Sequence, residues 1–544
     1  MNQMLAVYPS LHEPLLRSGV SAERRHYSKA KSAALCRDAA TIEYMVTRRG
    51  HKTVEATDER SDKCMGDIVK RKVAAGAGAL FCLVILWLAC AVQAAETQRF
   101  NLISIVTDDQ ARWSIGAYGN RESKTPQMDR LAREGARFLN AFACTPVCSP
   151  SRAAFLTGRY GTQLGITDWI APEEAGAGLG LPPETVTWPE VLQENGYVTG
   201  LIGKWHLGDQ PQFHPRNHGF HHFYGFLGGG ASPMDPTLEV DGQTRKLKGP
   251  IPDLLVDNAI QFVETNRQRP FALLLHFREP HLPYGPVPEV DSAPFKDLDP
   301  TVPQTPGADI AQVKQWTRDY YGSIHAVDRN LGRLLEKLEA LNLSQKTIIL
   351  FTSDHGYNIG HHGIHCKGNG WWIAGGVHGP TRPNMFEESI RVPLIIRWPG
   401  VAKPGLEIAD PVSNIDTFAS VLAMLGMAAP AGWKQEGIDF SPLLRGDTLP
   451  PREAIFAQYD LHHGGLAFMR MIRTDQWKLV RFHLADGLDE LYDLDGDQGE
   501  TRNLYRQGRH NRIRDELQQR LARWQRSIDD PVLKLHYGKG IKTP

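Results

Sequence analysis

Along most of the chain after residue 96, apolar and polar residues form two kinds of pattern, one typical of strands and one typical of helices. Short apolar runs bounded by turn residues are typical of buried strands, and we predict strands at residues 100–106, 197–202, 271–277, 347–352 and 392–396. Amphipathic spacing predicts helices at residues 126–136, about 189–195, about 310–341 and 415–425. Strands alternating with helices are typical of α/β proteins, in which helices cover both faces of a mostly parallel sheet. We therefore predict a large α/β domain over residues 96–445.

The pattern changes at about residue 446. Strand-like runs then follow one another at residues 456–459, 469–473, 477–482 and 490–494, and a basic helix is expected at about 512–527. Strands without intervening helices favour an antiparallel sheet. We predict a smaller C-terminal subdomain over residues 446–544, built from this antiparallel sheet and one helix.

The N-terminal part has the pattern of an export signal. Basic residues 70–72 precede an apolar run at residues 73–92, and a small-x-small pattern ends at Ala94. These are the three regions of a secretory signal peptide, which we predict at residues 65–95. We expect the protein to be exported, to the periplasm or the medium, with no stable membrane span after cleavage.

Two other readings of this segment are less favoured. The apolar run could be retained as a membrane-spanning helix, or Cys90 could carry a lipid anchor. Residues 1–64 show no convincing periodicity. We predict that they are a non-native or disordered extension upstream of a start at Met65.

Charge and cysteine content narrow the classes of function. Lysine plus arginine (61) equals aspartate plus glutamate (61), so no bulk charge points to nucleic acid or to a polyanion as a partner. Of the seven cysteines, only Cys144, Cys148 and Cys366 lie beyond the predicted signal peptide, too few for a disulfide framework. A Cys144–Cys366 bridge stays open as an alternative.

Polar residues of the types that bind metals or anions follow four predicted strands. They are Asp108 and Asp109, Lys204 and His206, His281, and Asp354 and His355. In open parallel sheets, ligands bind at the carboxyl ends of the strands. Polar residues often end strands for structural reasons alone, but four such clusters make that explanation unfavourable. We expect these side chains to line one site.

The clusters suit two kinds of ligand. Asp108, Asp109 and Asp354 would repel one another unless a cation joined them, and a hard divalent ion prefers such oxygen ligands. The Asp108-Asp109 pair alone could equally be a solvated turn. Lys204 and His206 lie two apart on an extended segment, so both can face one anion; a strand end with satisfied side chains is the alternative.

The run Cys148-Ser149-Pro150-Ser151-Arg152, followed by A-A-F-L-T-G-R, places a thiol at the entrance of a short helix, where free N–H groups favour an anion. This run resembles the signature of the type I sulfatases, members of the alkaline phosphatase superfamily. The segment G-K-W-H-L-G at 203–208 also matches a motif of that family. The resemblance covers nearly the whole predicted exported chain and implies the alkaline phosphatase-like fold.

The resemblance implies a modified residue and a metal. It implies that a sulfatase-maturing enzyme, such as the formylglycine-generating enzyme, oxidises Cys148 to Cα-formylglycine. One divalent metal, most often Ca²⁺ with Mg²⁺ as an alternative, would be held by the side chains at Asp108, Asp109, Cys148, Asp354 and His355. The family has Asp-His or Asp-Asn at this point, and His355 is a less natural ligand for calcium than an asparagine side-chain oxygen.

The resemblance also implies catalytic residues. Lys204 would bind the sulfate and His206 would contact the formylglycine. His281 would bind sulfate and protonate the leaving oxygen, and Lys367 would be a second sulfate-binding lysine. Arg152 would hold the modified side chain in place, and Asp354 would accept the proton of the attacking hydroxyl.

We therefore predict a hydrolase of sulfate monoesters, acting on sulfated carbohydrate or an aryl sulfate. A phosphate or phosphonate ester hydrolase of the same superfamily, and a non-catalytic sulfate-binding protein with unmodified Cys148, are the alternatives. Specificity is expected in loops at about 165–182, 209–250 and 364–384, with 209–250 predicted as one long loop. Residues 368–384 look like an insertion at the pocket mouth, where Trp371 and Trp372 could stack on substrate or simply pack.

Overall fold

The computed structural model describes residues 99–374, 381–484 and 488–534. The predicted extension at 1–64, the predicted signal peptide at 65–95 and part of the predicted insertion lie outside the described residues. No helix in the described part of the chain is both long enough and apolar enough to span a bilayer.

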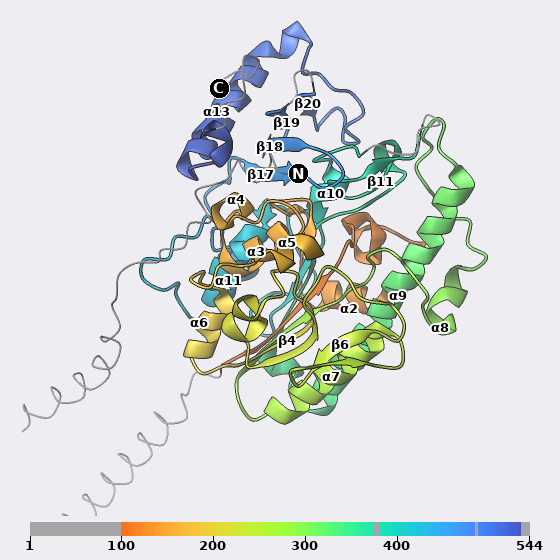
Figure 1. Cartoon of the computed structure of the whole chain (residues 1–544), viewed down its shortest axis with the longest axis vertical. Helices are drawn as coiled ribbons and strands as arrows, with labels where there is room; N and C mark the ends of the chain where they lie inside the picture. The colour runs from red at the N-terminus through yellow and green to blue at the C-terminus, as the bar shows by residue number, and fades with distance from the viewer. Residues whose placement is uncertain (1–98, 375–380, 485–487, 535–544) are drawn as a thin grey trace, which may run out of the picture. The chain divides into compact units, whose positions relative to one another are not determined.

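A ten-stranded mixed sheet organises the α/β part (Figure 1). Its strands lie in the order β15-β2-β14-β9-β1-β8-β4-β5-β6-β7. The central strands β9, β1, β8, β4 and β5 are parallel to their neighbours in this group. In sheet order, the bounds are β15 Leu406–Ile408, β2 Ala136–Phe138, β14 Leu394–Arg397, β9 Thr347–Ser353, β1 Asn101–Thr107, β8 Phe271–His276, β4 Val198–Lys204, β5 His222–Phe226, β6 Thr237–Val240 and β7 Gln243–Lys246. The predicted α/β fold with a parallel centre is confirmed.

The central strands are apolar on both faces because helices cover both. Successive residues Leu102 and Ile103 of β1 belong to two different cores, as expected for side chains that alternate across a sheet. One core is closed by α3 Cys148–Thr157, α6 Trp188–Glu194 and α11 Thr417–Met424. The other is closed by α2 Pro126–Glu134, α7 Ile251–Asn266 and α9 Ile310–Ala340. The continuous apolar runs of the sequence reflect this double burial.

Two details of the sequence-based prediction were wrong. Residues 209–250 do not form one long loop, because β5, β6 and β7 extend the sheet. The turn between β6 and β7 is Asp241-Gly242, with positive φ angles at both residues, which is a strong hairpin signal. The predicted helix at 126–136 ends at Glu134 because residues 136–138 pair as β2.

The C-terminal subdomain is a four-stranded antiparallel sheet with one helix, as predicted. Its strands are β17 Ile455–Leu461, β18 Ala467–Arg473, β19 Trp477–Phe482 and β20 Glu490–Asp493, and its helix is α13 Asn511–Ser527. One face of the sheet packs on α13 through Leu479 and Leu521. The other face packs against Val147, the residue before Cys148. Figure 1 shows this subdomain in blue beside α3 and α4.

Short elements connect these layers. Two three-stranded sheets are formed by β3 Ala141–Phe142 with β13 Arg391–Val392 and β16 Val412–Ser413, and by β10 Asn358–Ile359 with β11 Ile364–Cys366 and β12 Trp371–Trp372. The short helices are α4 Gly161–Leu164, α5 Pro172–Gly176, α8 Glu289–Ser292, α10 Glu387–Ile390 and α12 Ser441–Leu444.

Candidate active site

The four polar clusters meet at the carboxyl edge of the central strands. Asp108 follows β1, Lys204 ends β4, and Asp354 follows β9. β9 is the direct neighbour of β1, and β4 lies on the other side of β1 with only β8 between them, so parallel pairing brings their ends to one edge of the sheet. The register of pairing aligns Thr107 with Ser353, which sets the two acidic segments side by side.

Cys148 lies at the centre of this group, at the first position of α3. Its side chain is 2% exposed. The sulfur Sγ lies 3.0 Å from Lys367 Nζ, 3.5 Å from His355 Nε2 and 3.6 Å from Asp108 Oδ1. Burial raises the pKa of the thiol, but the ammonium groups of Lys204 and Lys367 outweigh burial and bring the pKa to about 6. The site thus stabilises negative charge at position 148.

This environment predicts a titration of the unconverted protein. With Cys148 left as a thiol, its thiolate absorbance should appear with a midpoint near pH 6, because it is protonated below its pKa and charged above it. Cys144 and Cys366 should contribute no thiolate absorbance until the pH is strongly alkaline, since burial raises the pKa of each thiol to about 12. A Cys148→Ala variant is the matched control. A midpoint near the ordinary thiol value would contradict the described cation environment.

Each of the three carboxylates contacts a cationic side chain. Asp108 Oδ2 lies 2.6 Å from Lys204 Nζ, and Asp109 Oδ1 lies 2.6 Å from Lys367 Nζ. Asp354 Oδ2 lies 2.9 Å from an Arg152 nitrogen and also accepts from Arg152 Nε at 3.1 Å. Burial raises the pKa of Asp108, but Lys204 and the neighbouring cations hold it well below its ordinary value. The carboxylates and the cations are therefore interleaved in a buried network.

The acidic group also has the donor set of a cation site. Ligand atoms of Asp108, Cys148, Asp354 and His355 lie within 4.8 Å of one another. Asp109 Oδ2 is buried without a hydrogen-bond partner in the described residues. A buried carboxylate oxygen without a donor is costly unless a cation neutralises it. The residues present thus fit a divalent ion.

His355 is oriented toward the carboxylates by its other ring nitrogen. Nδ1 donates to the Gly356 carbonyl at 3.0 Å. Nε2 then faces Asp109 at 3.3 Å and Asp354 at 3.5 Å. Burial lowers the pKa of this imidazole, but Asp354 raises it to about 9 overall. The orientation directs Nε2 at the carboxylates, where it would become a cation ligand on losing its proton.

Two site residues have a left-handed backbone, which is rare for residues other than glycine. They are Asp109, with φ of 68°, and His206, with φ of 60°. Such backbones cost about 1–3 kcal/mol and are found mainly where a site requires them. Within β4, directly before Lys204, a glycine is also required at Gly203, because a Cβ there would lie 1.8 Å from the His276 carbonyl oxygen.

His206 and His281 differ in exposure. His206 is buried, its Nε2 pairs with the Ile170 carbonyl at 3.1 Å, and its Nδ1 has no partner in the described residues. Burial holds its pKa well below the ordinary value, so it is neutral. His281 has 29% of its side chain exposed, and its Nε2 lies 3.7 Å from Asp109 Oδ2. His281 is therefore the more exposed of the two.

One residue of the site was missed by the sequence analysis. His276, the last residue of β8, is buried and contacts Arg152 at 3.4 Å, while its Nε2 has no partner in the described residues. A histidine at the carboxyl end of an otherwise apolar strand is the signal that could have identified it.

The insertion folds back on the site. The side chain of Asn384 donates to the Lys367 carbonyl at 2.9 Å, and the Gly368 N–H donates to the Pro146 carbonyl at 3.1 Å. Trp371 packs on His365 with ring centres 4.9 Å apart, and Trp372 packs against an apolar cluster that contains Phe386. Both tryptophans make packing contacts, which favours a packing role over stacking on substrate.

The three cysteines of the described ranges are free. The alternative of a Cys144–Cys366 bridge is therefore wrong.

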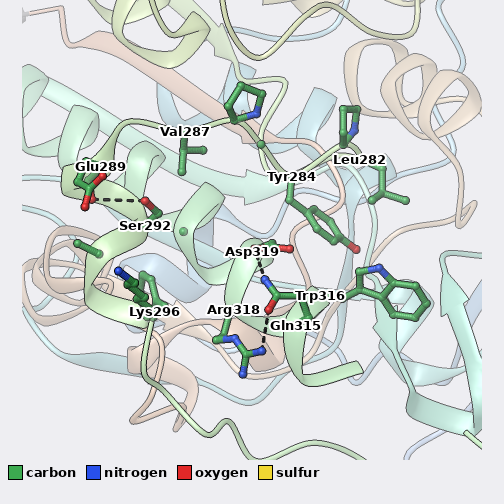
Figure 2. Close-up of a pocket in the computed structure, with 16 residues that line it drawn as sticks. Leu282, Tyr284, Val287, Glu289, Ser292, Lys296, Gln315, Trp316, Arg318 and Asp319 are labelled. Carbon is green, nitrogen blue, oxygen red and sulfur yellow. Dashed lines mark hydrogen bonds between the residues drawn. The ribbon is translucent and has the colours of Figure 1, made fainter. Parts of the chain in front are cut away.

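A cavity of about 750 Å³ lies beside the segment that follows His281 (Figure 2). Tyr284 and Trp316 form part of its wall, and Lys296 and Asp319 add charge. The predicted site residues are not among those that line it. The Tyr284 hydroxyl on this wall contacts Nε2 of His365, a residue of β11, at 2.7 Å.

Comparison with known protein families identifies the family and the class of enzyme. The sequence model described as Sulfatase matches residues 101–427, which is more than half of the chain. The chain belongs to the sulfatase family. A second model, described as the C-terminal part of N-sulphoglucosamine sulphohydrolase, matches residues 381–527. This protein is a sulfuric ester hydrolase, as the resemblance implied.

Individual relatives agree with this assignment. The sulfatase is 28% identical to the N-acetylglucosamine-6-O-sulfatase of Bacteroides thetaiotaomicron, over 80% of this chain and 88% of that protein. It is 31% identical to the steryl-sulfatase of Mus musculus, over 64% and 65% of the two chains. A solved structure of a protein with its substrate D-glucosamine-2-N,6-O-disulfate matches 80% of this chain and all of that chain, with a TM-score of 0.70 and 27% identity.

A phosphonate monoester hydrolase of Agrobacterium radiobacter shares the fold of this sulfatase, with a TM-score of 0.62 and 22% identity over 82% of this chain. That likeness concerns the fold alone. The phosphate or phosphonate ester hydrolase and the non-catalytic binding protein are not favoured.

Proposed function

We propose that this sulfatase removes sulfate from a sulfated carbohydrate by means of a formylglycine formed from Cys148 and one bound divalent metal, most simply Ca²⁺. The observation that carries the proposal is the position of Cys148 between three carboxylates and two lysines. The carbohydrate class is supported by the relatives, which include an N-acetylglucosamine-6-O-sulfatase. An aryl sulfate is the second candidate substrate.

Asp108, Asp109, Asp354 and His355 would hold the metal together with the side chain at position 148. The unpartnered Asp109 Oδ2 and the convergence of the other ligand atoms support this set. Oxygen-rich sets of this kind suit calcium or magnesium. The ion would supply positive charge beside the reacting sulfate.

Modification of Cys148 answers a chemical problem. A thiolate that attacked sulfur would remain sulfated, and water would have to cleave that bond slowly. A hydrated aldehyde at position 148 supplies two hydroxyls, one to attack sulfur and one whose deprotonation expels sulfate from the same carbon. The positive surroundings that lower the pKa of Cys148 to about 6 would equally favour an attacking oxygen anion. A sulfatase-maturing enzyme is the partner that this chemistry requires.

The remaining side chains divide the work on the sulfate ester. Lys204 and Lys367 would hold the sulfate oxygens, and Arg152 would keep Asp354 in place through the contacts described above. Asp354 would accept the proton of the attacking hydroxyl. His281, the more exposed of the two histidines, would donate a proton to the leaving oxygen. His206 is proposed to contact the modified side chain.

Replacing Lys367 by methionine tests the second sulfate-binding lysine. Removing one fixed charge that stabilises the transition state is expected to lower kcat by roughly 10²- to 10³-fold. Steady-state kinetics on an aryl sulfate would measure this, with the exposed Lys403→Met as the matched control. A loss of less than about threefold, in protein that folds and binds metal, would remove Lys367 from the mechanism.

The proposed function itself is tested with matched substrates. Purified enzyme with verified conversion at position 148 should turn over an aryl sulfate and a sulfated monosaccharide, and it should prefer the aryl sulfate to the matching aryl phosphate. A clear preference for the phosphate would overturn the proposal.

Export remains part of the proposal. The predicted signal peptide at residues 65–95 implies a periplasmic or secreted enzyme. N-terminal sequencing of the mature protein would test this, with a start near Ala95 as the expected result. A mature protein that begins within residues 1–64 would contradict it.

A further inference from the structure

A buried carboxylate ties the loop after α4 to the C-terminal subdomain. Asp168, 2% exposed, accepts hydrogen bonds from the Tyr459 hydroxyl at 2.8 Å and from the His462 N–H at 2.9 Å. It also accepts from the N–H and the Nδ1 of His463, both at 3.1 Å. These partners belong to the end of β17 and to the turn that follows it. The loop is thus anchored to a different layer of the protein.

The same loop contacts the catalytic signature on its other side. The Ile170 N–H donates to Ser149 Oγ at 3.0 Å, and Ser149 is the neighbour of Cys148. The Ile170 carbonyl is the partner of His206. Residues 168–170 therefore link Ser149 and His206 of the site to the C-terminal subdomain; together with α5 they are called the wall below.

Glu174 of α5 completes the arrangement. Its Oε1 lies 3.0 Å from His462 Nε2 and its Oε2 lies 3.3 Å from His463 Nε2. Both imidazoles are thereby held between Asp168 and Glu174. Burial lowers the pKa of His463, but the two carboxylates outweigh burial and raise it to about 9. Burial lowers the pKa of His462 as well, but Glu174 and Asp168 raise it above its ordinary value overall.

Two side chains of this wall remain accessible to a ligand. Trp169 is partly exposed; its ring packs on His463 with ring centres 4.4 Å apart and also against the apolar cluster that contains Val147, the residue before Cys148. Its indole N–H makes no hydrogen bond among those of the described residues, and it is not buried. Glu174 has 29% of its side chain exposed. A rigid aromatic surface beside a carboxylate acceptor is the combination that fits the apolar face and the hydroxyls of a sugar ring.

We propose that Trp169 and Glu174 form a recognition subsite for the sugar ring that carries the sulfate ester, with Asp168, His462 and His463 as positioning residues. This inference rests on the proposed function. Trp169 would pack on the ring, and Glu174 would accept a hydrogen bond from a hydroxyl of that ring. The partly exposed carboxylate of Glu174 favours a free hydroxyl over a second sulfate at this position.

The test compares Glu174→Gln with the matched control Glu173→Gln, an exposed neighbour in the same first turn of α5. The probes are N-acetylglucosamine 6-sulfate and 4-nitrophenyl sulfate, which has no hydroxyl to donate. Glu174→Gln is expected to lower kcat/KM for the sugar sulfate about tenfold or more and to leave kcat/KM for the aryl sulfate within about twofold. Trp169→Ala should also lower kcat/KM for the sugar sulfate, and Trp169→Phe should restore part of that loss.

The outcomes separate the subsite from the proposed function. If Glu174→Gln changes kcat/KM equally for both probes, or for neither, the subsite is wrong. Wild-type activity on the sugar sulfate would in that case still support the proposed function. A wild-type enzyme that cleaves the aryl sulfate and no sulfated sugar would overturn both. Thermal unfolding of each variant shows whether the substitution destabilises the wall. A destabilised wall would lower kcat/KM for both probes, whereas loss of the subsite would lower it for the sugar sulfate alone.

Discussion

Replacing Cys148 by serine is expected to reduce sulfate ester hydrolysis to background when the protein is made in a host that converts only cysteine. A serine hydroxyl occupies the same buried position at the start of α3, so the variant should fold. It would supply one hydroxyl where the proposed chemistry needs two on one carbon, and a sulfated serine would have no route to expel sulfate. Activity on an aryl sulfate and thermal unfolding would be measured together.

The control for this variant is Cys144→Ser. Cys144 is also buried and free, but it lies outside the reacting group. Its replacement should change stability more than turnover. If Cys148→Ser kept near-normal activity, the chemistry proposed for position 148 would be wrong.

Removal of the divalent ion with a chelator is expected to abolish turnover, for two reasons. The ion would no longer polarise the reacting group. In addition, Asp108 and Asp109 contact Lys204 and Lys367 at 2.6 Å, and an ion that takes over these oxygens frees the ammonium groups for sulfate. Both catalysis and anion binding should therefore depend on the metal.

This prediction is measured by activity and by sulfate binding in chelated protein, before and after Ca²⁺ or Mg²⁺ is added back. Circular dichroism would verify that the fold persists. Recovery with Ca²⁺ in preference to Mg²⁺ is the expected result. Full activity in protein shown by elemental analysis to be free of metal would contradict the metal site.

The sequence predicted the centre of this molecule better than its margins, for physical reasons. The runs that became β1, β8 and β9 are buried on both faces, so apolar character alone identified them. The residues that follow parallel strands must share one edge, which is why Asp108, Lys204 and Asp354 could be grouped without coordinates. The strands β6 and β7 were not predicted because they lie at the edge of the sheet. β7 is exposed along its whole length, so it has no apolar run that would mark it as a buried strand.

Contacts between distant segments were beyond prediction. Lys367 could be named from the resemblance, but its contacts with Asp109 and Cys148 depend on how the insertion folds back. His276 ends an apolar strand, but its contact with Arg152 joins residues 124 positions apart. The pairing of Asp168 with His462 and His463 joins residues almost three hundred positions apart, and no local pattern marks it.

The most direct test of the central claim is mass spectrometry of the peptide that carries Cys148, taken from enzyme whose turnover has been measured in the same preparation. The account predicts a peptide lighter by the replacement of SH₂ with oxygen, in a fraction that rises and falls with activity across preparations. Full activity in protein whose Cys148 is entirely an unmodified thiol would contradict it.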